Sequence, residues 1–278
     1  MNSDTLALNG GGMRGALQIG ALQELASESD DRLIERFSGG VYGYSIGALI
    51  GTLIAFEFEI AEFGPLIELL GNMQDTLNPL RLKTLLSFSE KQGVDDGTKI
   101  REVLARAFKE RGMDLNTLQI GDAAIPLYIV ASDLTDLKIV IFGQSTLVWD
   151  ALRASFSLPY IFTPHEVGGH VFVDGGVLCQ NIMKVVPPEK RERTLYLMNA
   201  QSKDSLVKNY LSSVAFAKTI KETHDARDRY PNNTCLLIED DTKMFSVWKS
   251  EDIVGHLVSV GRARYCEFRA KCGHQELT

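Results

Sequence analysis

Cysteine is scarce in this sequence, and the few cysteines present form no recognisable pattern. The chain has 278 residues and four cysteines, which are Cys179, Cys235, Cys266 and Cys272. No two of them form a CxxC pair, and none clusters with histidines, so zinc-binding and disulfide frameworks are both disfavoured. Cysteine used in this way fits a reducing compartment.

Long apolar runs and a secretory leader pattern are also missing. The most apolar segment, residues 44–56, is too short to span a bilayer and is better explained as a buried helix. The first residues, Met1 to Asp4, do not begin the basic, apolar and small-residue succession of a signal peptide. We therefore expect a cytoplasmic protein without a transmembrane segment, for which any membrane contact is peripheral.

Positive charge is outnumbered by negative charge. The chain has 29 Lys and Arg against 36 Asp and Glu, which gives a net charge of -7. Bulk charge therefore predicts no general affinity for nucleic acid or anionic lipid. Hydrophobic residues make up 45% and charged residues 23%, a globular profile that can bury a sizeable core. The length fits one large domain or two small ones.

The strongest local pattern lies at residues 41–56. An apolar run enters Gly43-Tyr44-Ser45-Ile46-Gly47, and a second apolar run of helix-forming composition follows. This pattern predicts a nucleophile elbow, in which Ser45 occupies a sharp turn between a strand and a helix. Gly43 and Gly47 fit because side chains would clash in so tight a turn. The helix N-terminus would favour negative charge at the serine, whereas the alternative is a plain turn between packed elements.

A glycine-rich segment follows an apolar strand at residues 5–8. It reads Asn9-Gly10-Gly11-Gly12-Met13-Arg14-Gly15 and opens a helix, as a dinucleotide fingerprint requires. The acidic residue expected about 20 positions on is missing, and the Ser45 elbow ends the second strand instead. The other interpretation is an oxyanion hole, because successive glycines let backbone N–H groups approach a negative oxygen closely. Both loops are expected to converge at one edge of the sheet, which favours a serine hydrolase over a nucleotide-binding protein.

A serine nucleophile needs a base, for which the sequence offers histidines or an aspartate. None of the five histidines stands in a context that marks it as a triad histidine. His165 and His170 bracket a predicted hairpin turn, and their spacing is not a recognised metal motif. Asp174 is the sharper candidate, because it ends an apolar strand and precedes Gly175-Gly176, where a neighbouring backbone can come close. Asp-Gly-Gly by itself usually marks only a turn.

The rest of the chain alternates strands and helices. Further strands are predicted at 127–131, 137–142, 171–173, 194–198 and 235–238. Helices are predicted at 16–29, 99–111, 147–156, 204–224 and 251–272. This alternation indicates an α/β fold with a central, mostly parallel sheet flanked by helices in three layers.

Two segments have open interpretations. Residues 60–90 contain the breakers Gly64-Pro65, Gly71-Asn72 and Asn78-Pro79, which predict two or three short helices in a mobile connection such as a lid. Ordinary helices that cover the core are the alternative. The last predicted helix has acidic residues at its start and basic residues towards its end, as the helix dipole favours. We interpret that basic end as a solvated helix face rather than a contact for phosphate headgroups.

Four motifs in this order resemble the patatin-like phospholipase family. They are the loop at 9–15, the elbow at 43–47, Arg153-Ala-Ser-Phe-Ser-Leu-Pro159 with Phe162-Thr-Pro164, and Asp174-Gly175-Gly176. The resemblance spans about residues 5–182, and residues of about 190–278 are expected to complete one patatin-like domain over 1–278. The family often has an aspartate in place of Asn9, a position for which the sequence suggests no catalytic role.

The resemblance implies a lipid acyl hydrolase that works through a Ser-Asp dyad without a metal or cofactor. Ser45 matches the nucleophile and Asp174 the base, while the matching oxyanion loop comprises Gly10, Gly11, Gly12 and Gly15 and carries Arg14. Supporting positions are Gly43, Gly47, Gly175, Gly176 and Pro159. The implied substrates are glycerophospholipids or other acyl lipids, cleaved at carboxylic esters as by a phospholipase A or lysophospholipase.

Several functional alternatives remain at this stage. An acyltransferase or a thioesterase could use the same acyl-enzyme, and an inactive lipid-binding module could keep the same fold. An aspartate of ordinary pKa, ~3.9, is a weak base for a hydroxyl, although burial raises that pKa. A carboxylate base predicts activity that persists at mildly acidic pH, whereas an acid limb near about pH 6.5 would indicate a histidine.

Overall fold

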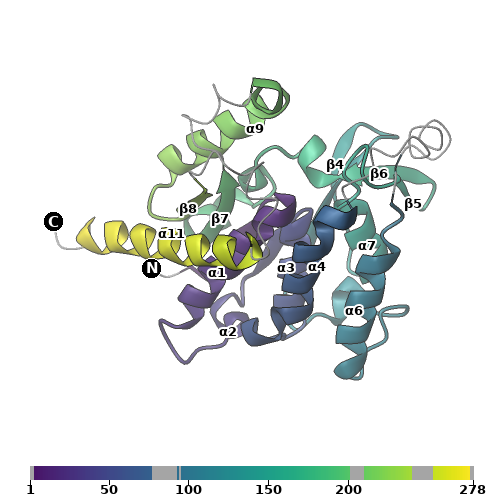
Figure 1. The fold of residues 1–278 in the computed structure, drawn as a ribbon, viewed down its shortest axis with the longest axis horizontal. Helices are drawn as coiled ribbons and strands as arrows, with labels where there is room; N and C mark the ends of the chain where they lie inside the picture. Colours follow the sequence, from purple (N-terminus) through teal and green to yellow (C-terminus); the bar gives the residue numbers. More distant parts are fainter. Residues whose placement is uncertain (1–2, 77–92, 94, 201–209, 240–252, 276–278) are drawn as a thin grey trace.

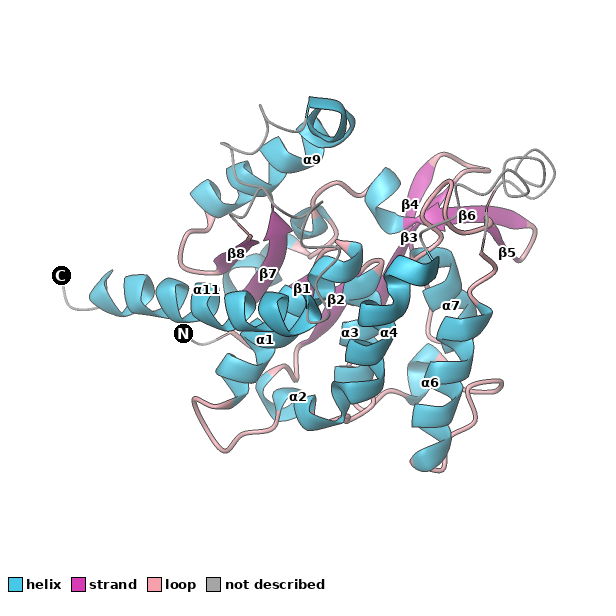
Figure 2. Ribbon diagram, in the orientation of Figure 1, coloured by secondary structure: helices cyan, strands magenta, loops and turns pink. Residues whose placement is uncertain are grey.

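A computed structural model describes residues 3–76, 93, 95–200, 210–239 and 253–275. Its strands form one mixed sheet with helices on both faces, which confirms the predicted three-layer α/β domain (Figure 1). Figure 2 shows the strands running through the centre, with α1, α3 and α11 on one side and α9 on the other. Among the described residues, no helix is both long and apolar enough to cross a membrane.

The sheet is parallel in its centre and antiparallel at one side. The strands are β1 (Thr5–Leu8), β2 (Gly40–Gly43), β3 (Leu127–Asp133), β4 (Lys138–Ile141), β5 (His165–Val167), β6 (His170–Asp174), β7 (Thr194–Ala200) and β8 (Thr234–Ile238). Their order is β5-β6-β3-β2-β1-β7-β8, and β4 pairs with β3. The pairs within β3-β2-β1-β7-β8 are parallel, while β4, β5 and β6 pair antiparallel.

The helices follow the predicted segments closely. They are α1 (Gly15–Ala26), α2 (Leu33–Arg36), α3 (Ile46–Ala55), α4 (Gly64–Thr76), α6 (Thr98–Glu110), α7 (Val148–Ser155), α9 (Tyr210–Arg229) and α11 (Ile253–Gln275). Every residue of α3 is buried, as its continuous apolar composition predicts. All four cysteines are free thiols.

Alternation along the strands divides the core between the two faces of the sheet. In β1, Leu6 and Leu8 belong to the larger cluster with side chains of α1, α3 and α11. Ala7 points to the opposite face, where it joins a smaller cluster with Tyr42 and Tyr196. Such strands are apolar on both sides because helices cover both faces of a parallel sheet.

The longest helix, α11, packs directly against α1 through two glycines. A Cβ on Gly20 of α1 would lie 2.0 Å from the carbonyl oxygen of Val258, and one on Gly261 of α11 would lie 2.1 Å from that of Leu17. The two backbones therefore approach more closely than any side chain would allow. This contact joins the end of the chain to its beginning.

One predicted helix break is wrong, whereas the one before it is confirmed. Helix α4 runs through the predicted break at Gly71-Asn72, but the break at Gly64-Pro65 separates a 3-10 helix, Ile60–Phe63, from α4, in which Pro65 is the second residue. Proline is tolerated in a first helical turn because the N–H it lacks would have no helical partner there. Gly71 packs near Val254 of α11, so tertiary contact keeps this stretch helical. The predicted breaker Asn78-Pro79 and the rest of the predicted lid lie outside the described residues.

The basic end of α11 is partly solvated, as its composition suggested, and partly paired: the Arg262 side chain is 54% exposed and the Arg269 side chain 34%. Arg262 Nε lies 3.2 Å from Glu24 Oε2, and Arg269 Nε lies 2.8 Å from Glu28 Oε1. These ion pairs fasten α11 to the end of α1 and to the turn that follows it. The acidic residues predicted at the helix start lie outside the described residues.

Candidate active site

Ser45 stands at the sharp turn between β2 and α3, as the elbow pattern predicts. Its backbone has φ 56° and ψ -132°, a conformation that non-glycine residues rarely adopt. A Cβ on Gly43 would lie 2.5 Å from the carbonyl oxygen of Gly47, and one on Gly47 would lie 2.4 Å from that of Leu8. Both glycines are therefore needed for the turn to fit against β1.

The strained turn is held from the side by a serine of α7. The backbone N–H of Ser45 donates to Ser155 Oγ at 3.0 Å, and that hydroxyl donates to the carbonyl oxygen of Val130 at 2.7 Å. Ser155 is fully buried. This residue lies inside the motif that carried the family resemblance, but its role was not visible in the sequence.

Asp174 reaches the elbow because β2 and β6 meet along β3. Strand β2 pairs with residues 127–129 of β3, and β6 pairs antiparallel with residues 131–133, so the carboxyl ends of β2 and β6 approach each other. A Cβ on Gly175 would lie 2.6 Å from both Tyr44 Cβ and the Val130 carbonyl oxygen. Gly175 therefore permits this approach, as the sequence suggested.

The Asp174 carboxyl group is buried, with only 4% of the residue exposed. Its Oδ1 accepts a hydrogen bond from the Gly176 N–H at 2.7 Å, while its buried Oδ2 has no hydrogen-bond partner. Burial raises the pKa of this carboxyl group to about 6, while the nearby Ser45 side chain and the Gly176 N–H, which favour the charged form, oppose that rise. The carboxyl group is thus a stronger base than an exposed aspartate.

Ser45 and Asp174 line the same pocket. Its volume is about 400 Å³, and the glycine loop forms part of its wall. Apolar side chains, among them Leu158, Val177 and Ile220, contribute other parts of the lining. The structure thus places the two residues together with an apolar space large enough for part of an acyl chain.

The glycine loop abuts the elbow, and its amides are not all equivalent. A Cβ on Gly10 would lie 3.0 Å from Ser45 Cβ, whereas one on Gly15 would lie 2.2 Å from Ile46. The N–H of Arg14 donates to the Gly11 carbonyl oxygen at 3.1 Å, and the N–H of Gly15 bonds the carbonyl oxygens of the preceding 3-10 turn. The Gly10 backbone hydrogen-bonds the buried Tyr44 hydroxyl group. Among the residues predicted to form the oxyanion hole, Gly11 and Gly12 are therefore left to provide backbone N–H groups to an oxyanion.

A buried amide network that the sequence did not reveal supports this loop. The Asn9 side chain donates to the Asn199 carbonyl oxygen at 2.9 Å and accepts from the Asn199 N–H at 2.7 Å. Gln18 donates to the carbonyl oxygens of Asn9 and Leu197, each at 3.0 Å. Asn9 thus joins β1 to β7 directly beneath the loop. A carboxylate could accept the Asn199 N–H but could not donate to its carbonyl oxygen.

Arg153 organises the turn that follows α7. Its guanidinium group bonds the Ser157 hydroxyl group and, at 2.8 Å, the carbonyl oxygen of Thr163. The Ser157 carbonyl oxygen in turn accepts the N–H of Asp174 at 2.8 Å. Pro159, predicted to support the site, is not among the residues lining the pocket, and its neighbour Leu158 is. Within the motif at residues 153–159, Arg153 therefore holds Ser157, and Ser157 in turn positions the backbone of Asp174.

Two of the histidines are paired with aspartates outside the pocket. His165 Nε2 lies 3.1 Å from Asp150 Oδ1, and His170 Nδ1 lies 2.9 Å from Asp133 Oδ2. No described histidine lines the pocket of Ser45. Among the described residues that line this pocket, Asp174 therefore supplies the carboxyl group.

The described residues contain one group with a metal-like arrangement, formed by Asp133, Asp136 and His170. Its donors already have other partners. Asp133 Oδ1 accepts the backbone N–H of Thr135 at 2.8 Å, and Lys138 Nζ lies 2.6 Å from Asp136 Oδ2. We interpret the group as a structural contact that holds the β3–β4 turn against β6.

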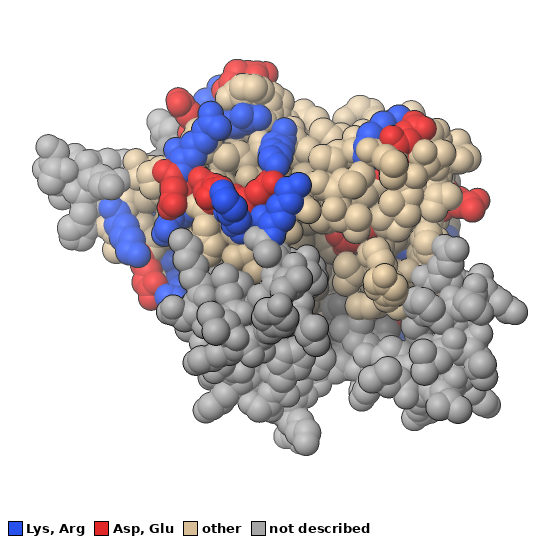
Figure 3. Space-filling model, turned by 90° about the horizontal axis from the view of Figure 1, so that it is seen from above, with Lys and Arg blue, Asp and Glu red and all other residues tan. Residues whose placement is uncertain are grey.

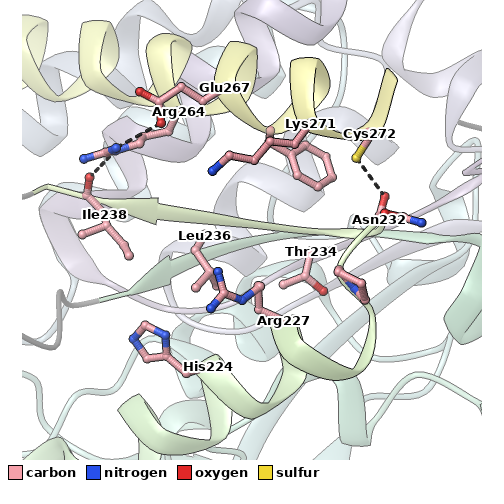
Figure 4. A pocket seen from close by; sticks show the side chains of 12 residues that line it. His224, Arg227, Asn232, Thr234, Leu236, Ile238, Arg264, Glu267, Lys271 and Cys272 are labelled. Carbon is pink, nitrogen blue, oxygen red and sulfur yellow. Dashed lines mark hydrogen bonds and ion pairs between the residues drawn. The ribbon is translucent and has the colours of Figure 1, made fainter. Parts of the chain in front are cut away.

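A second cavity lies between α9, β8 and α11 (Figure 4). Its volume is about 340 Å³, and its walls include Arg227, Arg264 and Lys271 but only one carboxylate, Glu267. Arg264 donates to the Ile238 carbonyl oxygen at 2.9 Å, across the edge of the sheet. Neither serine nor aspartate lines this cavity, so the pocket of Ser45 is the candidate active site.

The fold and the pocket define an α/β protein with a serine elbow facing a buried carboxyl group. A family model described as Patatin-like phospholipase matches residues 6–183, which is more than half of the chain. The chain belongs to this family. The resemblance drawn from the four sequence motifs is thereby confirmed.

Curated relatives match the same part of the chain. An uncharacterised NTE family protein of Mycobacterium tuberculosis is 30% identical over 173 residues, which is 62% of this chain and 42% of that protein. The rat patatin-like phospholipase domain-containing protein 7 is 29% identical over 182 residues, 64% of this chain and 12% of that protein. The chain thus spans less than half the length of these relatives.

Solved structures share the fold. VipD from Legionella pneumophila superposes with a TM-score of 0.55 at 15% identity, covering 98% of this chain and 67% of that chain. ExoU from the ExoU–SpcU complex of the Pseudomonas aeruginosa type III secretion system superposes with a TM-score of 0.52 at 16% identity, covering 98% and 52%. At such identities the similarity establishes the architecture alone.

Proposed function

We propose that the chain is a serine lipid acyl hydrolase, of the phospholipase A or lysophospholipase type, that cleaves carboxylic esters of glycerolipids. The observation that carries the proposal is the placement of Ser45 and Asp174 in one pocket beside the glycine loop. Membership of the Patatin-like phospholipase family supports the lipid substrate class. No metal or cofactor takes part in the proposed reaction.

Acylation begins at the Ser45 hydroxyl group. The carboxylate of Asp174 accepts its proton through Oδ2, the oxygen without a hydrogen-bond partner, while Oδ1 stays bonded to Gly176. Ser45 Oγ attacks the ester carbonyl carbon, and the amides of Gly11 and Gly12 stabilise the oxyanion. The N-terminus of α3 lies directly beneath the serine and favours the negative charge.

The acyl-enzyme then forms and is hydrolysed. Asp174 gives its proton to the leaving alcohol as the tetrahedral intermediate collapses. A water molecule next loses a proton to Asp174 and attacks the acyl carbon. As this second tetrahedral intermediate collapses, the bond to Ser45 Oγ breaks, Asp174 returns the proton to Oγ, and the free fatty acid leaves. The raised pKa of Asp174 assists the first step of each half-reaction, because a carboxylate with a pKa of about 6 accepts a proton more readily than one at 3.8.

Hydrolysis and acyl transfer differ only in the molecule that accepts the acyl group from the acyl-enzyme. Water yields free fatty acid, whereas a lipid alcohol would yield a new ester from the same acyl-enzyme. Product analysis with glycerol or lysophospholipid as a competing acceptor measures the ratio of the two products. We expect free fatty acid to predominate.

The central test compares wild type with Ser45→Ala and Asp174→Asn. Lipid products from phospholipid vesicles are profiled, and a serine-directed fluorophosphonate measures nucleophile reactivity. We expect Ser45→Ala to lose both labelling and product, and Asp174→Asn to lose on the order of 10²-fold or more in rate. The matched controls Ser259→Ala and Asp225→Asn alter exposed side chains of α11 and α9 and should behave as wild type. Full activity in Asp174→Asn would exclude the dyad.

A further inference from the structure

Large apolar side chains that remain exposed are concentrated on one part of the molecule. Among the described residues, those with the largest exposure come from the β3–β4 hairpin, the turn after α7 and the turn after β6. We call this set the apolar rim; it comprises Leu134, Leu137, Ile139, Ile141, Leu158, Tyr160 and Val177. Contiguous exposed apolar surface on a globular protein commonly marks an interaction site.

The apolar rim is continuous with the candidate active site. Leu158 and Val177 belong both to the rim and to the lining of the pocket that contains Ser45. The hairpin is joined to that pocket through Ser132, whose hydroxyl group donates to the Asp174 carbonyl oxygen at 2.9 Å. Ile139 is paired with Ser132 across the strands. Exposed apolar side chains therefore lie at the pocket itself and on the hairpin whose strand β3 pairs with the strand that ends in Asp174.

The two most exposed members of the rim are held in an unfavourable backbone conformation. Leu137 and Tyr160 are each 74% exposed, and their φ angles are 52° and 71°. Bulky residues rarely adopt positive φ, and such strain clusters at functional sites. Both side chains present most of their apolar surface to solvent, so they can be buried against another surface without rearrangement of the fold.

The charges around the rim point to a lipid surface. The Asp136 carboxylate is paired with Lys138, and the buried Asp133 side chain hydrogen-bonds His170 and the Thr135 N–H, so both hairpin carboxyl groups have partners within the chain. Seen from above, acidic and basic side chains gather over the side of α9, while the side of β4 and β6 is mostly neither (Figure 3). A chain of net charge -7 is not drawn to anionic surfaces by bulk charge, so apolar burial must supply the attraction.

We propose that the apolar rim inserts into a lipid surface and sets the mouth of the Ser45 pocket against it. Acyl lipid then enters the pocket from the membrane along the apolar surface of Leu158 and Val177. A lipid interface suits this irregular set of side chains, because it accepts apolar groups without a complementary shape. This inference rests on the proposed function, since it names the source of the lipid substrate.

The test measures flotation of the full chain with vesicles of neutral phosphatidylcholine. All proteins carry Ser45→Ala so that the lipid stays intact. The rim variant combines Leu137→Asn and Tyr160→Asn, because asparagine tolerates positive φ and the fold should be retained. We expect binding to weaken on the order of tenfold or more. We also expect Ser45→Ala without rim substitutions to bind equally well at high salt, where charge attraction is screened.

Glu57→Asn is the matched control. Glu57 also has a positive φ, 65°, but it follows the far end of α3 and pairs with Arg32 near α2. This variant should bind vesicles as Ser45→Ala alone does. Absence of vesicle binding, equal binding by the rim variant, or loss of binding at high salt would each overturn the proposal. A partner protein would then be the better occupant of the rim.

A second measurement separates this proposal from the proposed function. With Ser45 restored, the rim variant should lose about tenfold in hydrolysis of vesicle lipid but retain turnover of a water-soluble short-chain ester. Equal loss on both substrates would contradict a docking role for the rim. If wild type cleaves neither ester, the proposed function fails, while the flotation experiment still decides whether the rim binds lipid.

Discussion

At the scale of single residues, the burial of Asp174 serves the proposed catalysis but lowers the stability of the fold. Its carboxyl group is buried and has one unpartnered oxygen, an arrangement that favours the neutral form. The proposed reaction needs the ionised form. The same burial that makes Asp174 a better base therefore lowers the free energy of unfolding at neutral pH, where the group is ionised.

The pH dependence of activity follows from this environment. Because the pKa of Asp174 is raised to about 6, the base should become protonated, and kcat/KM should fall, as pH decreases through about 6. This revises the expectation that activity persists at mildly acidic pH. The measurement is kcat/KM for a soluble ester between pH 4.5 and 8.

An imidazole would produce a similar acid limb, since its ordinary pKa is about 6.5. Histidine variants therefore provide the control. His165→Gln and His170→Gln should leave the profile in place, because both side chains are engaged with aspartates away from the pocket. A profile that either substitution abolishes would make that histidine the base.

Replacing the buried carboxyl group should stabilise the fold at neutral pH. The folded pKa is raised from 3.8 to about 6, so this group favours folding below pH 3.8 and loses that contribution as pH rises through 6. Each pH unit between the two values corresponds to about 1.4 kcal/mol. Asp174→Asn keeps an oxygen for the Gly176 N–H and should gain ~3 kcal/mol in free energy of unfolding at pH 8.

Urea denaturation at pH 8 and pH 4 measures this effect. The gain should nearly vanish at pH 4, where the wild-type carboxyl group is largely protonated in the folded chain. Asp225→Asn, on the exposed side of α9, is the control and should change little at either pH. An Asp174→Asn protein less stable than wild type at pH 8 would show that the carboxylate is stabilised in the fold.

At the scale of elements, the contact between α1 and α11 depends on two glycines. Gly20→Ala and Gly261→Ala each place a methyl group about 2 Å from a backbone carbonyl oxygen of the opposite helix. The helices must separate to accommodate it, so each substitution should lower the free energy of unfolding by ~1–3 kcal/mol. Thermal or chemical denaturation provides the measurement.

Gly273→Ala is the matched control within the same helix. A Cβ at that position meets no atom within 4 Å, so alanine should be neutral or slightly stabilising through its higher helix propensity. Equal effects of Gly261→Ala and Gly273→Ala would show that the close packing of the two helices contributes nothing measurable.

Helix and strand positions could largely be predicted from local pattern, but helix ends and partners could not. The apolar run after Ser45 predicts a buried helix, and α3 is buried throughout. Gly71-Asn72 suggested a break, yet the segment stays helical where it packs near Val254. Propensity is a weak signal that a tertiary contact overrides.

At the scale of the whole molecule, the part of the chain beyond the family match completes the sheet. Strand β1 pairs with β2 on one side and with β7 on the other, with Thr5 opposite Thr194. Helix α11 covers α1. The first 183 residues alone would leave β1 as an exposed, apolar edge.

A chain cut after residue 185 should therefore fail to fold cooperatively, which tests the prediction of a single domain over 1–278. Circular dichroism melting and limited proteolysis compare it with the full chain. We expect no sharp unfolding transition and rapid digestion throughout. A cooperative transition in the truncated chain would show that the motif-bearing part is an independent domain.

The sequence by itself determined the family, the α/β class and the identities of Ser45 and Asp174 as candidates, because strained turns and close backbone approaches require glycines at fixed spacing. Only the tertiary structure brought the two side chains into one pocket, since β2 and β6 meet through their pairing with β3. It also decided the roles of Asn9, Asn199 and Ser155, whose hydrogen bonds join strands and helices far apart in the chain. A lone polar residue carries no local pattern, so its partner becomes known only when the chain is folded.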